Sequence, residues 1–261
     1  MTASGMNSAG DRGCPSAASI YDLLLAGRVH SLADRKEAFR ILSIAPEFRQ
    51  TCIANRRFME RAVRCLVRRG VTQFLDLGAG LPASPNVHEV ALELNPTARV
   101  VYVDSDPLVT SRGRDLPANT AMIEADLRDP VAIMEDKELI RLLDLDQPIA
   151  IMLLFALNHV ADNEDPAGIV AGFMEAVAPG SYMVLSHPTD DVDYGRCAAV
   201  SDGGTDGGAM GFCRSYMDIY RLFSGLYLVE PGLIRTSMWR PDEADVPQLG
   251  SVWAYGGVAC K

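Results

Sequence analysis

Five short apolar segments recur between residues 73 and 186. They are apolar almost throughout, which is typical of strands that are buried on both faces of a parallel sheet. Because parallel neighbours need a crossover connection, this pattern confines the chain to folds in which strands alternate with helices. The segments are residues 73–78, 99–104, 120–125, 149–155 and 181–186.

Helix signals lie between these segments. Asn86 and Glu89 have the spacing of a capping box, and an acid that can cap a helix precedes a proline at 106–107, 129–130 and 165–166. The alternation of strands and helices predicts an α/β fold with a doubly wound, mostly parallel sheet.

The pattern loosens after the fifth segment. Residues 190–213 are rich in Gly and Asp, and they predict a loop or flap. Residues 215–223 predict a last helix. Residues 226–230 and 252–258 predict two further strands, which we expect to pair antiparallel.

The part of the chain before the first strand differs. Residues 1–14 are rich in Ser, Gly and Ala, and we expect a disordered tail there. Residues 15–69 carry apolar residues at helical spacing, and Gly70 is a candidate C-cap. We expect residues 15–69 to form an N-terminal helical cap over a site; a helical layer packed on the sheet edge is the alternative. Residues 70–261 then form one Rossmann-like domain.

Charge and cysteine usage limit the partners. Lys and Arg number 24 against 34 Asp and Glu, and the net charge of −10 disfavours nucleic acid or an anionic membrane as the main partner. No apolar run has the length of a membrane span, and the N-terminus has no signal-peptide pattern. The six cysteines include no C-x-x-C pair and the four histidines no H-x-x-x-H pair, so we expect a cytoplasmic protein without a metal site.

The strongest local signal is the stretch Leu-Asp-Leu-Gly-Ala-Gly at 75–80, where the first strand ends. In open α/β sheets, ligands bind beyond the carboxyl ends of the strands, and glycines there let the backbone approach a ligand closely. The stretch predicts four ligand contacts. These are Asp76, Gly78, Ala79 and Gly80.

The ends of the next three strands add to this signal. Asp104 and Ser105 follow the second strand, where a carboxylate can accept both hydroxyls of a ribose. Asp126 and Leu127 follow the third, where an acid can accept a hydrogen bond from an adenine amino group. Ala156 follows the fourth. Together these residues predict a site for a nucleoside-containing ligand; the alternative is that the acids only cap turns and helices.

The glycine pattern distinguishes between cofactors. Gly80 is followed by Leu-Pro-Ala at 81–83, so the third glycine of a dinucleotide-binding turn is absent. An acid at Asp76 would repel a pyrophosphate but suits an amino group or a sulfonium. The site therefore predicts S-adenosylmethionine (SAM) rather than NAD. An NAD(P)-dependent oxidoreductase and a non-catalytic SAM-binding protein remain as alternatives.

Several longer motifs together resemble one family. They are Ala-Asn-Arg-Arg-Phe at 54–58, Gln-Phe-Leu-Asp-Leu-Gly at 73–78, Asn-Val-His-Glu-Val-Ala at 86–91, Ala-Asp-Leu-Arg-Asp-Pro at 125–130 and Tyr-Gly-Gly-Val-Ala at 255–259. From about residue 15 to the C-terminus the chain resembles the actinobacterial SAM-dependent methyltransferases that were long catalogued as a domain of unknown function. The resemblance implies a class I methyltransferase sheet of seven strands with a reversed final strand, fronted by N-terminal helices. It implies SAM as cofactor and leaves the acceptor open.

Methyl transfer requires alignment of donor and acceptor, and a base only if the acceptor must lose a proton. His159 is the first candidate base, although the family usually has its histidine one position earlier; His187 and Tyr21 follow. The predicted acceptor is a small molecule of specialised metabolism, with an aromatic or indole-containing compound, methylated on C, N or O, as one candidate, and a homodimer is compatible with this prediction. The residues predicted to contact the acceptor are Tyr21, His30, Asn55, Arg57, Phe58, His159 and Tyr216.

Overall fold

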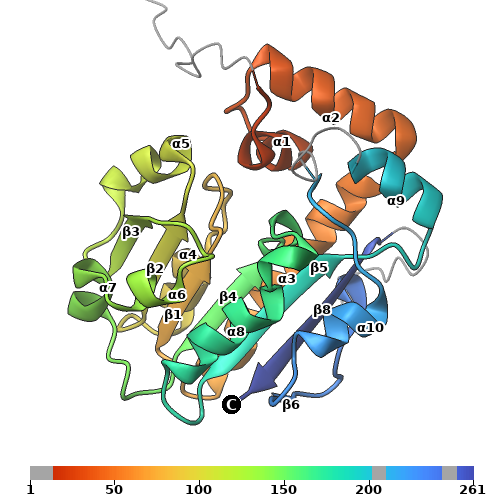
Figure 1. The fold of residues 1–261 in the computed structure, drawn as a ribbon. Helices are drawn as coiled ribbons and strands as arrows, with labels where there is room; N and C mark the ends of the chain where they lie inside the picture. The colour runs from red at the N-terminus through yellow and green to blue at the C-terminus, as the bar shows by residue number, and fades with distance from the viewer. Residues whose placement is uncertain (1–13, 202–209, 243–251) are drawn as a thin grey trace, which may run out of the picture.

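The computed structural model describes residues 14–201, 210–242 and 252–261. Its centre is a sheet in the order β3-β2-β1-β4-β5-β8-β6, in which the first five strands along the chain run parallel (Figure 1). These five confirm the predicted parallel sheet. They are β1 (Gln73–Leu77), β2 (Arg99–Asp104), β3 (Thr120–Glu124), β4 (Ala150–Leu154) and β5 (Tyr182–Pro188).

The far edge of the sheet reverses direction. β8 (Ala254–Cys260) pairs antiparallel with β5, and β6 (Tyr227–Leu228) pairs antiparallel with β8, as the sequence predicted. A further two-residue strand, β7 (Ile234–Arg235), also pairs with β8. The described sheet therefore has eight strands where seven were expected, and the fold class is confirmed.

The order of the strands creates a switch point. The chain runs outward from β1 through β2 to β3, and then crosses to β4 on the other side of β1. Loops leaving the carboxyl ends of β1 and β4 consequently diverge and leave a crevice between them, which is where ligands bind in sheets of this kind.

Helices cover both faces of the sheet. On one face, α3 (Phe48–Arg68) and α4 (Val87–Leu94) bury apolar residues such as Phe58 and Val90 against Phe74 of β1. On the other face lie α6 (Pro130–Met134), α7 (Lys137–Leu142), α8 (Pro166–Glu175) and α10 (Tyr216–Arg221). Both faces of β1 and β4 are thereby buried, which explains why their sequences are apolar throughout.

The helices begin where the capping signals are. Asn86 forms a capping box with Glu89 at the start of α4. The side chains of Asp106, Asp129 and Asp165 cap α5 (Pro107–Thr110), α6 and α8, each with proline at the start of the helix. After α3, Gly70 has a φ of +90°, a conformation that favours glycine.

The N-terminal helices α1 (Ala17–Leu24), α2 (Leu32–Ile44) and α3 follow the helical prediction, but they do not share one core. α1 and α2 bury Ile20, Leu24 and Ile41 in a separate, smaller cluster, beyond the carboxyl ends of the parallel strands (Figure 1). α3 contributes to that cluster with its first residues and to the core on the sheet with the rest. The boundary at residue 69 between a cap and a main domain remains a prediction.

The expectation of a loop over residues 190–213 is wrong for its first half. Residues Tyr194–Ser201 form a helix, α9, which buries Cys197 and Val200 in the cluster of α1 and α2. Arg40 of α2 donates to the carbonyl oxygens of Ala199 and Val200, the last turn of α9, at 2.8 Å each. Partners distant in sequence therefore stabilise this helix. Residues 202–209, and residues 1–13 of the predicted disordered tail, lie outside the described residues.

Candidate functional site

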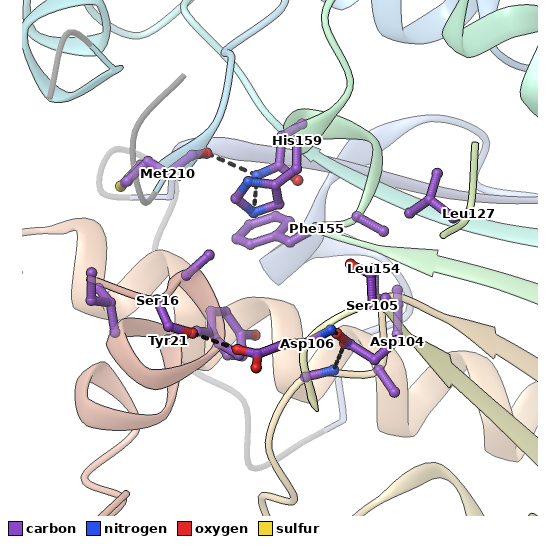
Figure 2. Close-up of a pocket in the computed structure, with 18 of the residues that line it drawn as sticks. Ser16, Tyr21, Asp104, Ser105, Asp106, Leu127, Leu154, Phe155, His159 and Met210 are labelled. Carbon is purple, nitrogen blue, oxygen red and sulfur yellow. Dashed lines mark hydrogen bonds between the residues drawn. The ribbon is translucent and has the colours of Figure 1, made fainter. Parts of the chain in front are cut away.

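A cavity of about 490 Å³ lies at the carboxyl ends of β1, β2 and β4 (Figure 2). The loops after these strands form one side, and Ser16, Ile20, Tyr21 and Leu24, at or in α1, form part of the other. The volume falls in the range of small-molecule sites. Its position is the switch point of the sheet.

The turn after β1 is tied to β2. The backbone nitrogens of Gly78 and Ala79 both donate to the carbonyl oxygen of Val103, at 2.9 and 3.1 Å. Gly78 has a φ of +72°, and a Cβ atom there would lie 2.8 Å from the Cβ of Ala156. Gly80 has a φ of +67°, and a Cβ there would meet no atom within 4 Å. Glycine at both positions therefore shapes a turn whose backbone borders the cavity.

The carboxylate of Asp104 borders the cavity at the end of β2. One of its oxygens accepts a hydrogen bond from the backbone nitrogen of Gly80 at 2.8 Å, and the other accepts from that of Asp106 at 2.9 Å. Burial raises the pKa of this carboxyl above its ordinary value. A carboxylate oxygen has more than one lone pair, so Asp104 keeps acceptor capacity for the hydroxyls of a ligand.

Asp76, inside β1, is buried without a hydrogen-bonding partner. Its side chain lines the cavity, its exposed fraction is 7%, and no described residue donates a hydrogen bond to its carboxylate. Burial raises the pKa of Asp76 to about 7, and the Asp104 carboxylate adds to this effect, while the Arg56 guanidinium opposes it. A buried carboxylate of this kind favours a cationic ligand group.

The loop after β3 is anchored by ion pairs. Arg128 contacts Asp126 at 3.0 Å and Glu164 at 2.8 Å, and it donates to the carbonyl oxygen of His159 at 3.0 Å. Leu127, between the two charged residues, borders the cavity with an apolar side chain. The loops after β3 and β4 are thus held together on this side of the cavity.

Tyr21 and Asn55 connect α1 to the sheet. The Tyr21 hydroxyl donates to the carbonyl oxygen of Cys52 at 3.3 Å and accepts from the Asn55 amide at 3.0 Å. The Asn55 oxygen in turn accepts from the Ser186 hydroxyl in β5 at 2.6 Å. Burial raises the pKa of Tyr21, so its hydroxyl keeps its proton. The ring of Tyr21 meets Phe155 edge to face, with centroids 6.1 Å apart.

His159 lies in η2 (Leu157–His159), the turn after β4, and its ring borders the cavity (Figure 2). Its Nε2 lies 3.2 Å from the amide nitrogen of Asn158, which also donates to the carbonyl oxygen of Met210 at 2.8 Å. Burial and, to a smaller extent, the Arg128 guanidinium together lower the pKa of His159 to about 4. The imidazole is therefore neutral near pH 7.

The residues predicted to contact the cofactor all border this one cavity. They are Asp76, Gly78, Ala79, Gly80, Asp104, Ser105, Asp126, Leu127 and Ala156. Of the residues predicted to contact the acceptor, the cavity lining includes Tyr21, Asn55 and His159. The strand ends thus converge as the sequence predicted. Only some of the residues predicted to contact the acceptor lie at the cavity.

The other residues predicted to contact the acceptor lie elsewhere. His30 accepts a hydrogen bond from Arg35 at the surface, and Arg57 is exposed. Phe58 is fully buried in the core, edge to face with Trp239 at 5.4 Å. Tyr216 packs on Tyr220 and Tyr255. None of the four borders the cavity as the described residues define it.

His187, the second candidate base, also lies outside the cavity lining. It is fully buried, its Nδ1 lies 2.7 Å from the carbonyl oxygen of Pro188, and its Nε2 lies 2.6 Å from the Arg214 guanidinium. Burial and the Arg214 guanidinium together lower its pKa to about 3. Both ring nitrogens are thus engaged in the core, and the role of His187 as a base stays a prediction.

The cavity also includes residues that were not predicted. Ser16 donates to the carboxylate of Asp106 at 3.0 Å, which joins the start of α1 to the start of α5 across the rim (Figure 2). Both residues are helix N-caps, and the sequence predicted only the capping role of Asp106. Arg56, by contrast, was a candidate contact to the cofactor carboxylate or a polar acceptor together with its neighbours Asn55 and Arg57; it borders the cavity and donates to the carbonyl oxygen of Pro85 at 2.6 Å. Met210 reaches it from a distant part of the chain, without a local signal.

Neither a metal-binding cluster nor a membrane-spanning helix is found in the part of the chain that the structure describes. No group of three or more His, Cys, Asp or Glu side chains is arranged to hold a metal ion there. Among the described helices, none combines the length and the apolar character needed to cross a membrane.

Solved structures of two bacterial proteins are similar to this chain along almost its whole length. A DUF574 family protein from Streptomyces avermitilis gives a TM-score of 0.91 at 35% sequence identity, covering 96% of this chain and 99% of its own. A candidate methyltransferase from Thermobifida fusca gives 0.91 at 36% identity, covering 99% of each chain. The plantazolicin methyltransferase BpumL, solved with S-adenosylhomocysteine (SAH) and a triazolic desmethylPZN analog, gives 0.53 at 10% identity, covering 94% of this chain and 96% of its own. At that identity the likeness concerns the fold alone.

The comparison of sequences agrees with the structures. No significantly similar protein was found among curated proteins. The family model described as S-adenosyl methyltransferase matches residues 5–261, which is nearly the whole chain. The chain therefore belongs to this family of SAM-dependent methyltransferases.

Proposed function

We propose that this methyltransferase transfers the methyl group of SAM to a small, largely apolar acceptor that carries an aromatic ring, such as an indole. The observation that supports this proposal is the division of the cavity. Its strand-end side carries carboxylates and glycine backbone, whereas the side under α1 is lined by Ile20, Leu24, Phe48, Phe155 and Met210. An apolar wall with few polar groups favours an apolar ligand.

The polar side fits the cofactor of the family. The unpartnered carboxylate of Asp76 suits the ammonium group of the methionine part, and Asp104 suits the ribose hydroxyls. The open backbone at Gly80 and the apolar side chain of Leu127 leave room for the rest of the cofactor. When SAM is bound, its sulfonium supplies a methyl group that is already activated for transfer. The NAD-dependent alternative is wrong for a member of this family.

The residues of the acceptor side support catalysis by alignment. The Tyr21 hydroxyl keeps its proton and donates a hydrogen bond to the carbonyl oxygen of Cys52, and His187 is buried in the core. Neither side chain is therefore well suited to take a proton from an acceptor. The protein's contribution is then to hold a nucleophilic acceptor close to the methyl group while α1 excludes water. Orientation of this kind can account for a large part of a rate enhancement.

The remaining parts of the proposal concern partners and location. We propose that the reaction belongs to specialised metabolism, with the acceptor as the main partner and a second copy of the chain as a candidate one. The net charge of −10 supports the exclusion of nucleic acid and of anionic membranes. The six cysteines are all free thiols, which supports the cytoplasm as the compartment.

The test is turnover of SAM with a panel of indoles and phenols, measured as release of SAH and as mass of the methylated product. We expect turnover with aromatic acceptors and loss of activity in Asp104→Ala. Asp146→Ala, which changes an exposed acid remote from the cavity lining, is the matched control and should keep its activity. A protein that binds SAM but turns over none of the aromatic acceptors would contradict the proposed acceptor class.

A further inference from the structure

The orientation of the Asn158 side chain is determined by its surroundings. Its amide nitrogen lies 2.8 Å from the carbonyl oxygen of Met210, an atom that only accepts hydrogen bonds. The reversed orientation would place two oxygens against each other. Asn158 is 2% exposed, so solvent does not compete for these contacts.

This orientation assigns the tautomer of His159. The same amide nitrogen lies 3.2 Å from Nε2 of His159, and an amide NH₂ group can donate two hydrogen bonds. Nε2 is then the acceptor, and a neutral imidazole that accepts at Nε2 carries its proton on Nδ1. Burial and the Arg128 guanidinium keep the ring neutral, so Nδ1–H is its single donor. Among the described residues, none is hydrogen-bonded to Nδ1.

The backbone of η2 and of Val160, the residue after it, is fixed at four carbonyl groups. The carbonyl oxygens of Leu157 and Val160 accept from the Arg214 guanidinium at 2.9 and 2.7 Å, and that of Asn158 accepts from the backbone nitrogen of Phe212 at 2.6 Å. The carbonyl oxygen of His159 accepts from Arg128. The imidazole is thus presented to the cavity from a turn with little freedom to rearrange.

We propose that His159 acts as a hydrogen-bond donor through Nδ1, that it holds an oxygen or ring nitrogen of the acceptor, and that Asn158 is the positioning residue that fixes this polarity. The proposal deepens the proposed function, on which its acceptor half rests. It names the acceptor class more closely: an aromatic compound with a hydrogen-bond-accepting atom that faces η2. It also removes His159 as a general base, because the lone pair of Nε2 is directed at Asn158.

The tautomer can be measured without a ligand. Two-dimensional NMR of protein labelled with heavy nitrogen in histidine distinguishes a protonated ring nitrogen from an unprotonated one, and His159→Gln assigns the signal. We expect the proton on Nδ1 in the unmodified protein. In Asn158→Asp, an accepting carboxylate should move it to Nε2. Arg128→Ala, which removes a nearby cation but no partner of the ring, should leave it on Nδ1. A proton on Nε2 in the unmodified protein overturns the proposal.

The donor role is tested with two probes of nearly equal shape, acetophenone and α-methylstyrene, which differ in a carbonyl oxygen. We expect SAH-loaded protein to bind acetophenone about fivefold more tightly, the effect of one hydrogen bond. Asn158→Asp and His159→Phe should lose this preference. Equal affinities in the unmodified protein overturn the donor role. Such a result leaves the proposed function standing if aromatic acceptors are turned over, so the two failures are distinguishable.

Discussion

Asp76 sits in a strand where its negative charge opposes folding, and this allows a quantitative prediction. Its carboxyl has a pKa of about 7 in the folded chain against an ordinary value of 3.8. The folded chain therefore holds this proton more tightly than the unfolded chain. The free energy of unfolding should fall as the pH rises through this window, because the unfolded chain loses the proton first.

The variant Asp76→Asn removes the charge and keeps the shape. One pKa unit corresponds to about 1.4 kcal/mol, so the rise in the pKa of Asp76 from 3.8 to about 7 gives a stabilisation of the free protein of about 2 kcal/mol near pH 5.5 and about 4 kcal/mol near pH 8.5. These values are upper bounds, since a buried site relaxes around a charge. Urea unfolding at the two pH values measures them, with Asp146→Asn as a control on an exposed acid.

The same variant should weaken cofactor binding, because the ammonium group of SAM or SAH loses its anionic partner. We expect a loss of about tenfold or more in SAH affinity, the effect of one charge-assisted hydrogen bond. In the unmodified protein the SAH affinity should rise with pH as Asp76 ionises, and in Asp76→Asn this dependence should disappear.

The stability measurements can refute this reasoning. They do so if Asp76→Asn is no more stable than the unmodified protein at either pH, or if its gain in stability does not grow with pH.

Three further predictions concern residues around the site. Gly78→Ala should destabilise the protein by about 1–3 kcal/mol in urea unfolding, because the positive φ of Gly78 and the nearby Ala156 both oppose a Cβ atom. Unchanged stability would contradict this prediction. Phe58→Ala should lower the free energy of unfolding by about 3–5 kcal/mol, because Phe58 packs against Trp239 and the core. The SAH affinity of the folded variant should stay within about twofold of the unmodified protein. A larger loss of affinity would place Phe58 in the site. Arg214→Lys should destabilise the protein by about 2–4 kcal/mol in thermal unfolding, since an ammonium group does not reproduce the hydrogen bonds of the guanidinium to the carbonyl oxygens of Leu157 and Val160. Unchanged stability would contradict this.

The strand-end side of the cavity could be predicted because its signals are local. A glycine turn or an acid at the end of an apolar strand marks its own position, and parallel strands bring their carboxyl ends to one edge. Asp76, Gly80, Asp104 and Leu127 needed nothing more than correct strand ends to be placed on one cavity. The helix caps followed for the same reason, since Asp106 and Asp129 act on neighbours a few residues away.

The acceptor side could not be predicted in this way. In a helix, adjacent residues point about 100° apart, so Asn55 and Arg56 border the cavity while Arg57 is exposed and Phe58 enters the core. Only the packing of α3 decides which of these faces the site. Met210 comes from a segment whose sequence predicted only a loop.

The central claim is that the cavity at the ends of β1 and β2 binds the cofactor, and a calorimetric titration with SAH tests it most directly. We expect micromolar affinity, about −8 kcal/mol, for the unmodified protein and for the Asp146→Ala control. Asp104→Ala should abolish the binding, because the Asp104 carboxylate holds the glycine turn and, in the proposed function, accepts the ribose hydroxyls. Unchanged SAH affinity in Asp104→Ala, or no binding in the unmodified protein, would contradict the account.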